Sequence, residues 1–461
     1  MRYFKKVGEV LLYLLVFLLP LQTRLIIRPG MVNFGYLEYG TISLYVTDII
    51  LVVLLSFLAL NFLWPQAKKF LTINWFLPKT KTDYALVALV FLELIVFISI
   101  FFAPYKLLAI YKYALFLAGV IIFLIISRSN FFSRLKLIYS LLAGIFLQAI
   151  LAIYQFVTQS TFASKILGLA AHDSVISGVS VVEAYNRQGL LLRWLRSYGS
   201  LDHPNILGGV LAVGIIILLG LLVERKKWQI AEKHKRLFIM VNYFLLFFFS
   251  VALLFTFSRA AYLAAFIGAV TVLLLSASCH LKQKMNPKSL ECGFILGFGL
   301  LFIVICSMLF SAIDIRFFND SRLEQISNRE RIGGYAEAAQ SIIARPLAGW
   351  GVGNYYLSLY SREPYFPSYF YQPAHNVLLL AAAEIGVVGA LWFILFIGFI
   401  VWKKLVNFKS SGLALALILA LSIMAMVDHW LWSLHFGIFF FWLVLGIITW
   451  EIGDKKFSVL K

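Results

Sequence analysis

The chain has 461 residues, of which 62% are hydrophobic and 13% charged. This composition excludes a water-soluble globular protein, because so many apolar side chains need lipid as their solvent. The formal net charge of +19 would suggest a nucleic-acid partner if the basic residues formed one surface, but they are spread over short loops between apolar segments.

About twelve apolar segments are each long enough to cross, as a helix, a hydrocarbon core of about 30 Å. They lie near residues 8–22, 46–64, 84–103, 107–127, 135–157, 204–223, 238–257, 261–278, 291–313, 386–402, 411–428 and 434–451. The first ends at Gln22-Thr23-Arg24 without the small residues of a signal-peptide cleavage site, so we expect a retained span. The sequence therefore predicts an all-α polytopic membrane protein with a single transmembrane domain over residues 1–461.

Basic residues follow every second apolar segment. They occur at the N-terminus and near residues 68–81, 128–136, 225–236, 282–288, 403–409 and 455–461. Lysine and arginine near span ends resist translocation, so this alternation predicts that these loops and both termini are cytoplasmic. On this topology two long segments face outward, near residues 158–203 and 314–385, and site chemistry is expected there.

The first outward segment ends with Gly199-Ser-Leu-Asp-His-Pro-Asn205, directly before a span. Pro204 suits the first turn of a helix, so we expect His203 and Asn205 to cap it. The alternative is that these two side chains line the acceptor side of a site.

A short outward turn, Thr256-Phe-Ser-Arg259, precedes the span near residues 261–278. The free amides and the positive dipole end of that helix lie beside Ser258 and Arg259, which predicts an anion site. An arginine whose side chain only reaches the lipid headgroups fits Arg259 equally well.

The second outward segment is predicted to contain an amphipathic helix. Ser327 and Glu330 match a capping box, and apolar residues then recur at helical spacing until Pro346. Arg331 is expected near the first turn, although Gly333-Gly334 weakens the helix prediction. Taken alone, Arg331 fits a solvated helix residue.

A glycine-rich turn and an aromatic run follow Pro346. Gly349, Gly351 and Gly353 can form a nest of backbone amides for phosphate, which is a weak signal by itself. The tyrosines and phenylalanines of residues 355–371 suit sugar stacking, but an interfacial aromatic belt explains them more simply.

Three histidines precede or flank the last spans. Taken alone, His375 beside Asn376 fits a helix cap better than a general base. His429 and His435 flank a further outward turn rich in tryptophan, and we expect them to anchor the membrane interface rather than to act as ligands.

Together these motifs resemble the O-antigen ligase and polymerase superfamily. The similarity rests on Thr256-Phe-Ser-Arg259, on Arg331 and Tyr335 ahead of Pro346-Leu-Ala-Gly-Trp-Gly-Val-Gly353-Asn354, and on His375-Asn376 followed by Glu384-Ile-Gly386. It covers roughly residues 198–389, and the N-terminal third is similar only in hydropathy. Tyr335 stands where relatives often carry tryptophan, and both are amphipathic aromatic residues.

The resemblance implies a GT-C-type glycosyltransferase of the bacterial cytoplasmic membrane. It would move a glycan from an undecaprenyl-diphosphate carrier to an acceptor hydroxyl outside the cytoplasm, with residues 314–385 as the catalytic loop. Arg259 and Arg331 would grip the diphosphate, and His375 would deprotonate the acceptor or help to position the base. The substrate-binding residues implied around them are Ser258, Gly351, Gly353, Asn354, Tyr335, Asn376, His203 and Asn205.

No metal or other cofactor is expected. Neither outward segment carries an Asp-x-Asp type cluster, and the three cysteines lack the spacing of metal ligands. Each charge-assisted hydrogen bond from arginine to the leaving diphosphate is worth about 1.5–3 kcal/mol, so two arginines can replace a metal ion. A histidine near two guanidinium groups is also biased toward the neutral form that a general base needs.

Other functions fit part of the pattern. A polysaccharide polymerase of the same superfamily would use the same donor, and a lipid-linked glycan transporter or flippase would also have about twelve spans. A transporter is expected to carry ionisable residues deep in its spans, where Glu93 and Lys112 are the candidates. The polar residues gather outside the spans instead, which favours the enzyme over a transporter. A non-catalytic envelope-assembly protein also fits the composition, and no motif selects the acceptor.

Overall fold

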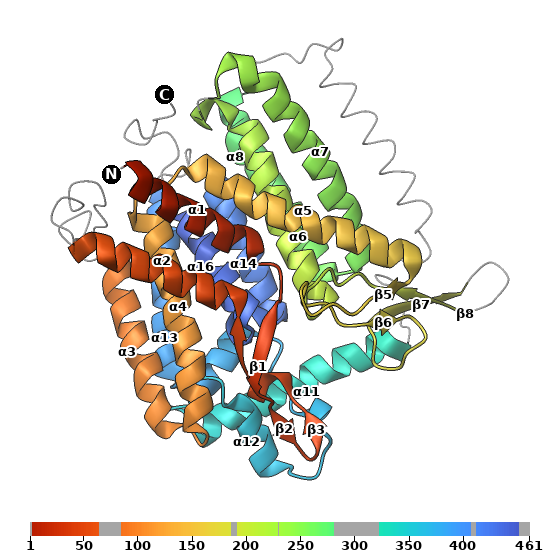
Figure 1. The fold of residues 1–461 in the computed structure, drawn as a ribbon. Helices are drawn as coiled ribbons and strands as arrows, with labels where there is room; N and C mark the ends of the chain where they lie inside the picture. The colour runs from red at the N-terminus through yellow and green to blue at the C-terminus, as the bar shows by residue number, and fades with distance from the viewer. Residues whose placement is uncertain are drawn as a thin grey trace.

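The computed structural model describes residues 2–63, 84–185, 191–228, 230–280, 322–406 and 412–450. Long helices form a bundle, and all the named strands lie at one end of it, which we call the strand end (Figure 1). Helix α1 begins toward the opposite end (Figure 1). The predicted span near residues 291–313 lies outside the described residues.

The described residues up to Leu195 contribute five helices and all eight named strands. The helices are α1 (Arg2–Leu18), α2 (Val46–Leu63), α3 (Tyr84–Phe102), α4 (Lys106–Arg128) and α5 (Arg134–Thr158). Four antiparallel two-stranded sheets are formed by β1 (Arg24–Arg28) with β4 (Ile42–Tyr45), β2 (Met31–Val32) with β3 (Gly35–Tyr36), β5 (Ser160–Thr161) with β6 (His172–Asp173), and β7 (Val181–Tyr185) with β8 (Leu191–Leu195). The all-α prediction contained none of these strands, which are too short to give a clear alternating pattern.

The described residues after Leu195 are mainly helical. They form α6 (Pro204–Val223), α7 (Glu232–Thr256), α8 (Arg259–His280), α11 (Arg322–Ala344), α12 (Tyr355–Arg362), α13 (Val377–Val406), α14 (Gly412–Val427), α15 (Trp430–Ser433) and α16 (His435–Ile448). Short 3₁₀ turns lie at Glu38–Gly40, Arg225–Trp228 and Ser368–Phe370.

Among the described helices, α3, α4, α5, α6, α7 and α13 are long and apolar enough to cross a membrane. Large apolar side chains also point outward from the bundle, such as Phe91 at 46%, Phe266 at 68% and Leu391 at 54% exposure. In water these rings and branched chains would be unfavourable, whereas lipid solvates them. The helices confirm the prediction of a helical membrane protein, and the number of twelve spans stays a prediction.

Glycines allow the helices to approach closely at several crossings. A Cβ on Gly119 of α4 would lie 2.2 Å from the indole of Trp442 on α16, and one on Gly214 of α6 would lie 2.8 Å from the ring of Phe249 on α7. Small residues at such crossings let a large partner pack against the backbone, which is a common mode of helix association in membranes.

Helix α13 is interrupted at Gly386, where φ is 76° and ψ is 166°. The glycine-rich turn that follows α11 docks onto this break, with the Val387 amide donating to the Pro346 carbonyl at 2.8 Å and the Gly351 amide donating to the Glu384 carbonyl at 2.8 Å. Non-helical backbone is tolerated at membrane depth only where protein groups satisfy it, and this turn supplies those groups. The break therefore locks the loop of residues 345–354 onto α13.

Helix α11 differs from its prediction at one end. It begins at Arg322 and not after Ser327, so the predicted capping box lies within the helix and Arg331 is in its middle. The stop before Pro346 is confirmed, because the helix ends at Ala344. The capping-box motif misled because Ser and Glu at this spacing also occur inside exposed helices.

We predict that Gly386→Ala destabilises the fold. The left-handed conformation at this position costs a residue with a side chain about 1–3 kcal/mol, and a Cβ would lie 2.0 Å from the Leu347 carbonyl oxygen. Thermal unfolding in detergent should show a lower midpoint for this variant. Gly398→Ala, in the same helix with nothing within 4 Å of the added Cβ, is the matched control and should not lower the midpoint. Equal midpoints for the two variants would contradict the account of the break.

Candidate active site

Asp428 is the centre of a polar network at the strand end. It follows α14, is 8% exposed, and receives hydrogen bonds from the Asn205 side-chain amide at 3.2 Å and from the backbone amide of His429 at 2.8 Å. The Nδ1 atom of His375 lies 3.6 Å from its Oδ1 atom. The carboxylate therefore joins the first turn of α6, the loop before α13 and the turn after α14.

His375 is held in place by its neighbours. Asn376 caps α13, because its Oδ1 accepts from the amides of Leu378 and Leu379 at 2.9 and 3.0 Å. Its Nδ2 donates to the Met426 carbonyl at 3.1 Å. Tyr335 of α11 donates from its hydroxyl toward the carbonyl of His375 at 3.3 Å. The cap is thus Asn376, and the imidazole of His375, whose side chain is 27% exposed, is left for other contacts.

Arg196 lies beside this network, and Arg259 and Arg331 are near enough for their charges to act on it. The buried Arg196 donates to the Asn205 Oδ1 at 2.7 Å and to the Thr256 carbonyl at 2.8 Å. Burial lowers the pKa of Arg196 to about 10, and the positive charges of Arg331 and Arg259 act in the same direction. Like charges oppose one another unless an anion is shared, so such a cluster has the character of an anion site.

The turn that carries Arg259 is fixed by a strained residue. Phe257 ends α7 in the left-handed conformation, with φ of 48°, and its fully buried ring packs with Phe156 and Phe255. Ser258 is buried, and its carbonyl accepts the first bond of α8 from the Tyr262 amide at 3.0 Å. Arg259 is therefore the first residue of α8, at the positive end of the helix dipole.

The other histidines of the cluster are neutral near pH 7. Burial, the charge of Arg196 and the neighbouring histidines lower the pKa of His203 to about 3. Burial and the nearby His375 likewise lower the pKa of His429 to about 4. Burial by itself disfavours the ionised form of Asp428, but the nearby imidazoles of His375, His429 and His203 hold its pKa well below its usual range. The network thus combines an ionised carboxylate with neutral imidazoles.

His203 and Asn205 both contribute to the start of α6, and Asn205 also bonds to the polar network. His203 is the N-cap of α6, since its Nδ1 accepts from the Asn205 amide at 3.1 Å, while its Nε2 lies 3.2 Å from the Ser180 hydroxyl. The Asn205 side chain connects Arg196 to Asp428. The capping expected from the sequence is therefore present, and Asn205 also belongs to the polar network.

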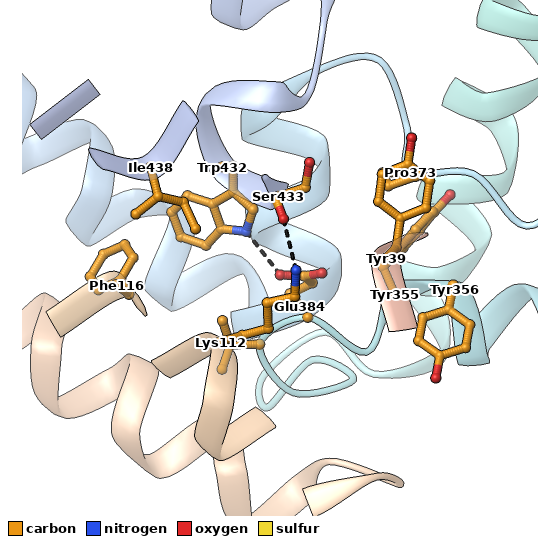
Figure 2. Close-up of a pocket in the computed structure, with 12 residues that line it drawn as sticks. Tyr39, Lys112, Phe116, Tyr355, Tyr356, Pro373, Glu384, Trp432, Ser433 and Ile438 are labelled. Carbon is orange, nitrogen blue, oxygen red and sulfur yellow. Dashed lines mark hydrogen bonds between the residues drawn. The ribbon is translucent and has the colours of Figure 1, made fainter. Parts of the chain in front are cut away.

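A cavity lies behind His429, lined by Tyr39, Tyr355, Pro373 and other residues (Figure 2). The Nε2 atom of His429 is 3.5 Å from the Tyr39 hydroxyl, and its Nδ1 is 2.7 Å from the Ser433 hydroxyl. His429 and His435 are both 5% exposed and Trp430 is 1% exposed, so they do not anchor a membrane interface as expected. Sequence cannot distinguish buried aromatic residues from interfacial ones.

The cavity also holds the charged residue that the transporter hypothesis relied on. Lys112 donates to the Ser433 carbonyl at 2.9 Å, and Trp432 donates to the Glu384 carboxylate at 2.8 Å, as Figure 2 shows. Lys112 and Glu384 also attract one another. Lys112 is therefore part of the scaffold under His429, whereas the Glu93 carboxylate has no hydrogen-bond partner among the described residues.

In the predicted glycine nest, backbone amides bind a carboxylate of the protein itself, that of Glu384. The amides of Gly353 and Tyr355 bond the Glu384 carboxylate, and a Cβ on Gly351 would lie 2.4 Å from Ala103. Asn354 accepts from the Tyr105 amide at 2.9 Å. Gly351, Gly353 and Asn354 thus contact the α3–α4 connection and the cavity, rather than joining the bonds that link Arg196 to His375.

His375, Asp428 and His429 present ligand-type atoms that all lie within 4.8 Å of one another. Two imidazoles and a carboxylate form a donor set that transition metals accept. The positive charges of the adjacent Arg196, Arg259 and Arg331 oppose a further cation at this place. His375, Asp428 and His429 are instead well placed to accept a proton beside an anion site.

The structure brings Arg259, Arg331, His375, His203 and Asn205 to one end of the bundle. Sequence reasoning missed Arg196 and Asp428. Arg196 lies in a loop predicted to face outward, where the positive-inside rule makes arginine and lysine infrequent. An arginine at such a position could have been recognised as a candidate site residue. The sequence around Asp428 contains no such signal, because its partner Asn205 lies 223 residues away.

The fold and this site together define a helical membrane protein with an arginine cluster and a His–Asp pair at one end of its bundle. Residues 243–394, about a third of the chain, match the family model described as O-antigen ligase. The chain therefore carries a domain of the O-antigen ligase superfamily, which indicates glycosyltransferase-like enzyme activity. No protein with a curated description matches the chain in sequence.

We predict that the fold loses stability on acidification and that His203→Asn reduces this loss. Histidine in the unfolded chain binds a proton near its ordinary pKa of 6.5, whereas folded His203 does so only near 3. Stability is therefore present above pH 6.5 and falls as the pH drops toward 3, by at most about 1.4 kcal/mol per pH unit for this site. Asparagine offers a capping oxygen in place of the Nδ1 atom of His203 and does not titrate. Unfolding midpoints across this range should show a shallower slope for the variant, and identical slopes would contradict the buried neutral state.

Proposed function

We propose that the chain transfers a glycan from an undecaprenyl-diphosphate carrier to an acceptor hydroxyl, without a metal ion. The observation that carries the proposal is the meeting of Arg196, Arg259 and Arg331 beside the His375–Asp428 pair. A diphosphate needs cations that match its geometry, and an acceptor hydroxyl needs a base close to the sugar that leaves the diphosphate. The match of residues 243–394 to the O-antigen ligase family model supports this donor class.

The arginines would hold the donor headgroup. As the bond from the anomeric carbon to the phosphate oxygen breaks, its electron pair moves to the diphosphate, which gains negative charge. Guanidinium groups fixed before the reaction stabilise that charge without reorganisation. Arg259 and Arg331 contact the diphosphate in this proposal, and Arg196 holds Asn205 and adds to the positive potential.

His375 would accept the proton of the acceptor hydroxyl. Its Nδ1 faces the Asp428 carboxylate, which favours a proton on Nδ1 and leaves the Nε2 lone pair available. The acceptor oxygen forms the new bond to the anomeric carbon while its proton passes to Nε2. Asp428 orients the imidazole and stabilises the imidazolium that forms, the same division of labour as in other His–Asp pairs.

We further propose that the strand end faces away from the cytoplasm in a bacterial cytoplasmic membrane. Residues 128–136, 225–236 and 403–404 carry many lysines and arginines and lie at the opposite ends of the same helices. Cationic loops are retained in the cytoplasm. Lipid-linked donor and acceptor would then meet at the outer leaflet, where the arginines lie. A polymerase of the same superfamily would differ in its acceptor, which would be a second lipid-linked glycan.

We predict that His375→Ala lowers glycan transfer by about 10²–10⁴-fold, the usual contribution of a general base. Asp428→Asn should lower transfer less, because it removes the orienting charge but not the imidazole. Transfer is measured with purified protein, a defined undecaprenyl-diphosphate glycan and candidate acceptors. Glu93→Gln is the control, since a carboxylate in a span has no role in transfer but would be needed in a transporter. Normal transfer by His375→Ala would rule out the base assignment.

We also predict that Arg259→Ala and Arg331→Ala each lower transfer by roughly 10²-fold or more, because each removes a charge-assisted bond to the diphosphate. Membrane insertion should be unchanged. Arg329→Ala is the matched control for Arg331, since Arg329 is exposed on the same helix. A chelator should leave wild-type transfer intact. Loss of transfer on chelation, with restoration by a divalent ion, would contradict the metal-independent mechanism.

A further inference from the structure

The β2–β3 hairpin ends in a turn that places an aromatic ring in solvent at a cost. Asn33 and Phe34 are its two central residues and both have positive φ, 47° and 63°. This is the pattern of a type I′ turn, in which glycine is preferred at the second position because side chains strain the left-handed conformation. Phe34 stands there with its side chain fully exposed at 103%, so no packing of the ring offsets the strain.

Asn33 fastens this turn to the loop that leads to the candidate active site. Its side-chain amide donates to the carbonyls of Pro364 and Phe366, each at 2.7 Å. Gly35 fits against Ser368 so closely that a Cβ on the glycine would lie 2.2 Å from the serine hydroxyl. Phe34 is thereby set beside the loop that carries Tyr365 and Tyr369, which are 93% and 74% exposed.

Exposure is selective along this aromatic stretch. Tyr355, Tyr356 and Tyr371 are 1%, 7% and 0% exposed and belong to the core. The Tyr371 hydroxyl donates to the Glu363 carbonyl at 2.5 Å, which closes the loop that presents Tyr365 and Tyr369. The exposed rings are therefore held by a rigid support that lies shortly before His375 in the chain. We call Phe34, Tyr365 and Tyr369 the aromatic platform.

The platform lies at the strand end of the bundle. Strand β4 leads into α2 and pairs with β1, and the β2–β3 hairpin between them lies next to α12 at the strand end (Figure 1). Phe34 has a strained backbone and an exposed ring, and it lies on the side of the bundle that holds the arginines. This combination indicates a surface that binds a ligand.

We infer that the aromatic platform binds the saccharide chain of the substrate at a distance from the reacting sugar. Aromatic rings offer flat apolar faces to the C–H faces of sugars, and tyrosine adds a hydroxyl that bonds sugar hydroxyls. A rigid ring also costs little conformational entropy on binding. This inference rests on the proposed function, and it adds that longer glycans are bound more tightly through Phe34, Tyr365 and Tyr369 than short ones.

The test separates binding from transfer by using a His375→Ala background. Fluorescent envelope-type oligosaccharides, from disaccharide to octasaccharide, are titrated into the full chain in nanodiscs. The octasaccharide should bind more tightly than the disaccharide. Phe34→Gly should weaken octasaccharide binding by about tenfold while leaving the unfolding midpoint unchanged or higher, because glycine relieves the turn. The Tyr365→Ser, Tyr369→Ser double variant should weaken binding at least as much.

Phe162→Ser is the matched control, because Phe162 is an exposed aromatic residue of another loop at 46% exposure. Octasaccharide binding that is equal in Phe34→Gly, in the tyrosine variant and in the control would overturn the inference. Defective nanodisc incorporation of the platform variants would also overturn it, in favour of a lipid contact. Binding that depends on the platform, in a chain that performs no transfer before His375 is replaced, would support the platform and reject the proposed function alone.

Discussion

The ionised carboxylate of Asp428 is the interaction on which the arrangement of the site depends. It accepts hydrogen bonds from Asn205 and from the His429 backbone, and it faces His375 across 3.6 Å. Through Asn205 it is also connected to the buried Arg196. A buried charge is costly unless it is paired and hydrogen-bonded, so the helices that supply these partners are held together. The same carboxylate orients the imidazole and lies beside the guanidinium cluster.

The scaffold under the site is built from one backbone break and two buried charged side chains, Glu384 and Lys112. Gly386 interrupts α13 so that the glycine-rich turn can dock onto it, and the Glu384 carboxylate near the break binds amides of that turn. Trp432, in the turn after α14, donates to Glu384, and Lys112 of α4 donates to the Ser433 carbonyl of the same turn. Charged residues at membrane depth are often functional. Here Lys112 has a structural explanation, since it supports the turn that carries His429 and Asp428.

Much of this could be predicted from sequence, and the limits are physical. Apolar length predicted the helices of the bundle, and local motifs located Arg259 and His375. Asp428 was missed because its role arises only from contacts far apart in the sequence, and the capping box at Ser327 misled because the helix starts earlier, at Arg322. The aromatic run could not be divided into core and surface, since that division depends on the β2–β3 hairpin, which has too few residues to show a strand pattern.

The central claim is that one diphosphate headgroup is bound where the arginines meet the His–Asp pair. Electron cryo-microscopy of the chain in nanodiscs with undecaprenyl diphosphate tests it most directly. The account predicts phosphate density in contact with the guanidinium groups of Arg259 and Arg331, with the His375 imidazole on the side from which an acceptor would approach. Phosphate density in the cavity lined by Lys112 and Tyr39, or at the opposite end of the bundle, would contradict it.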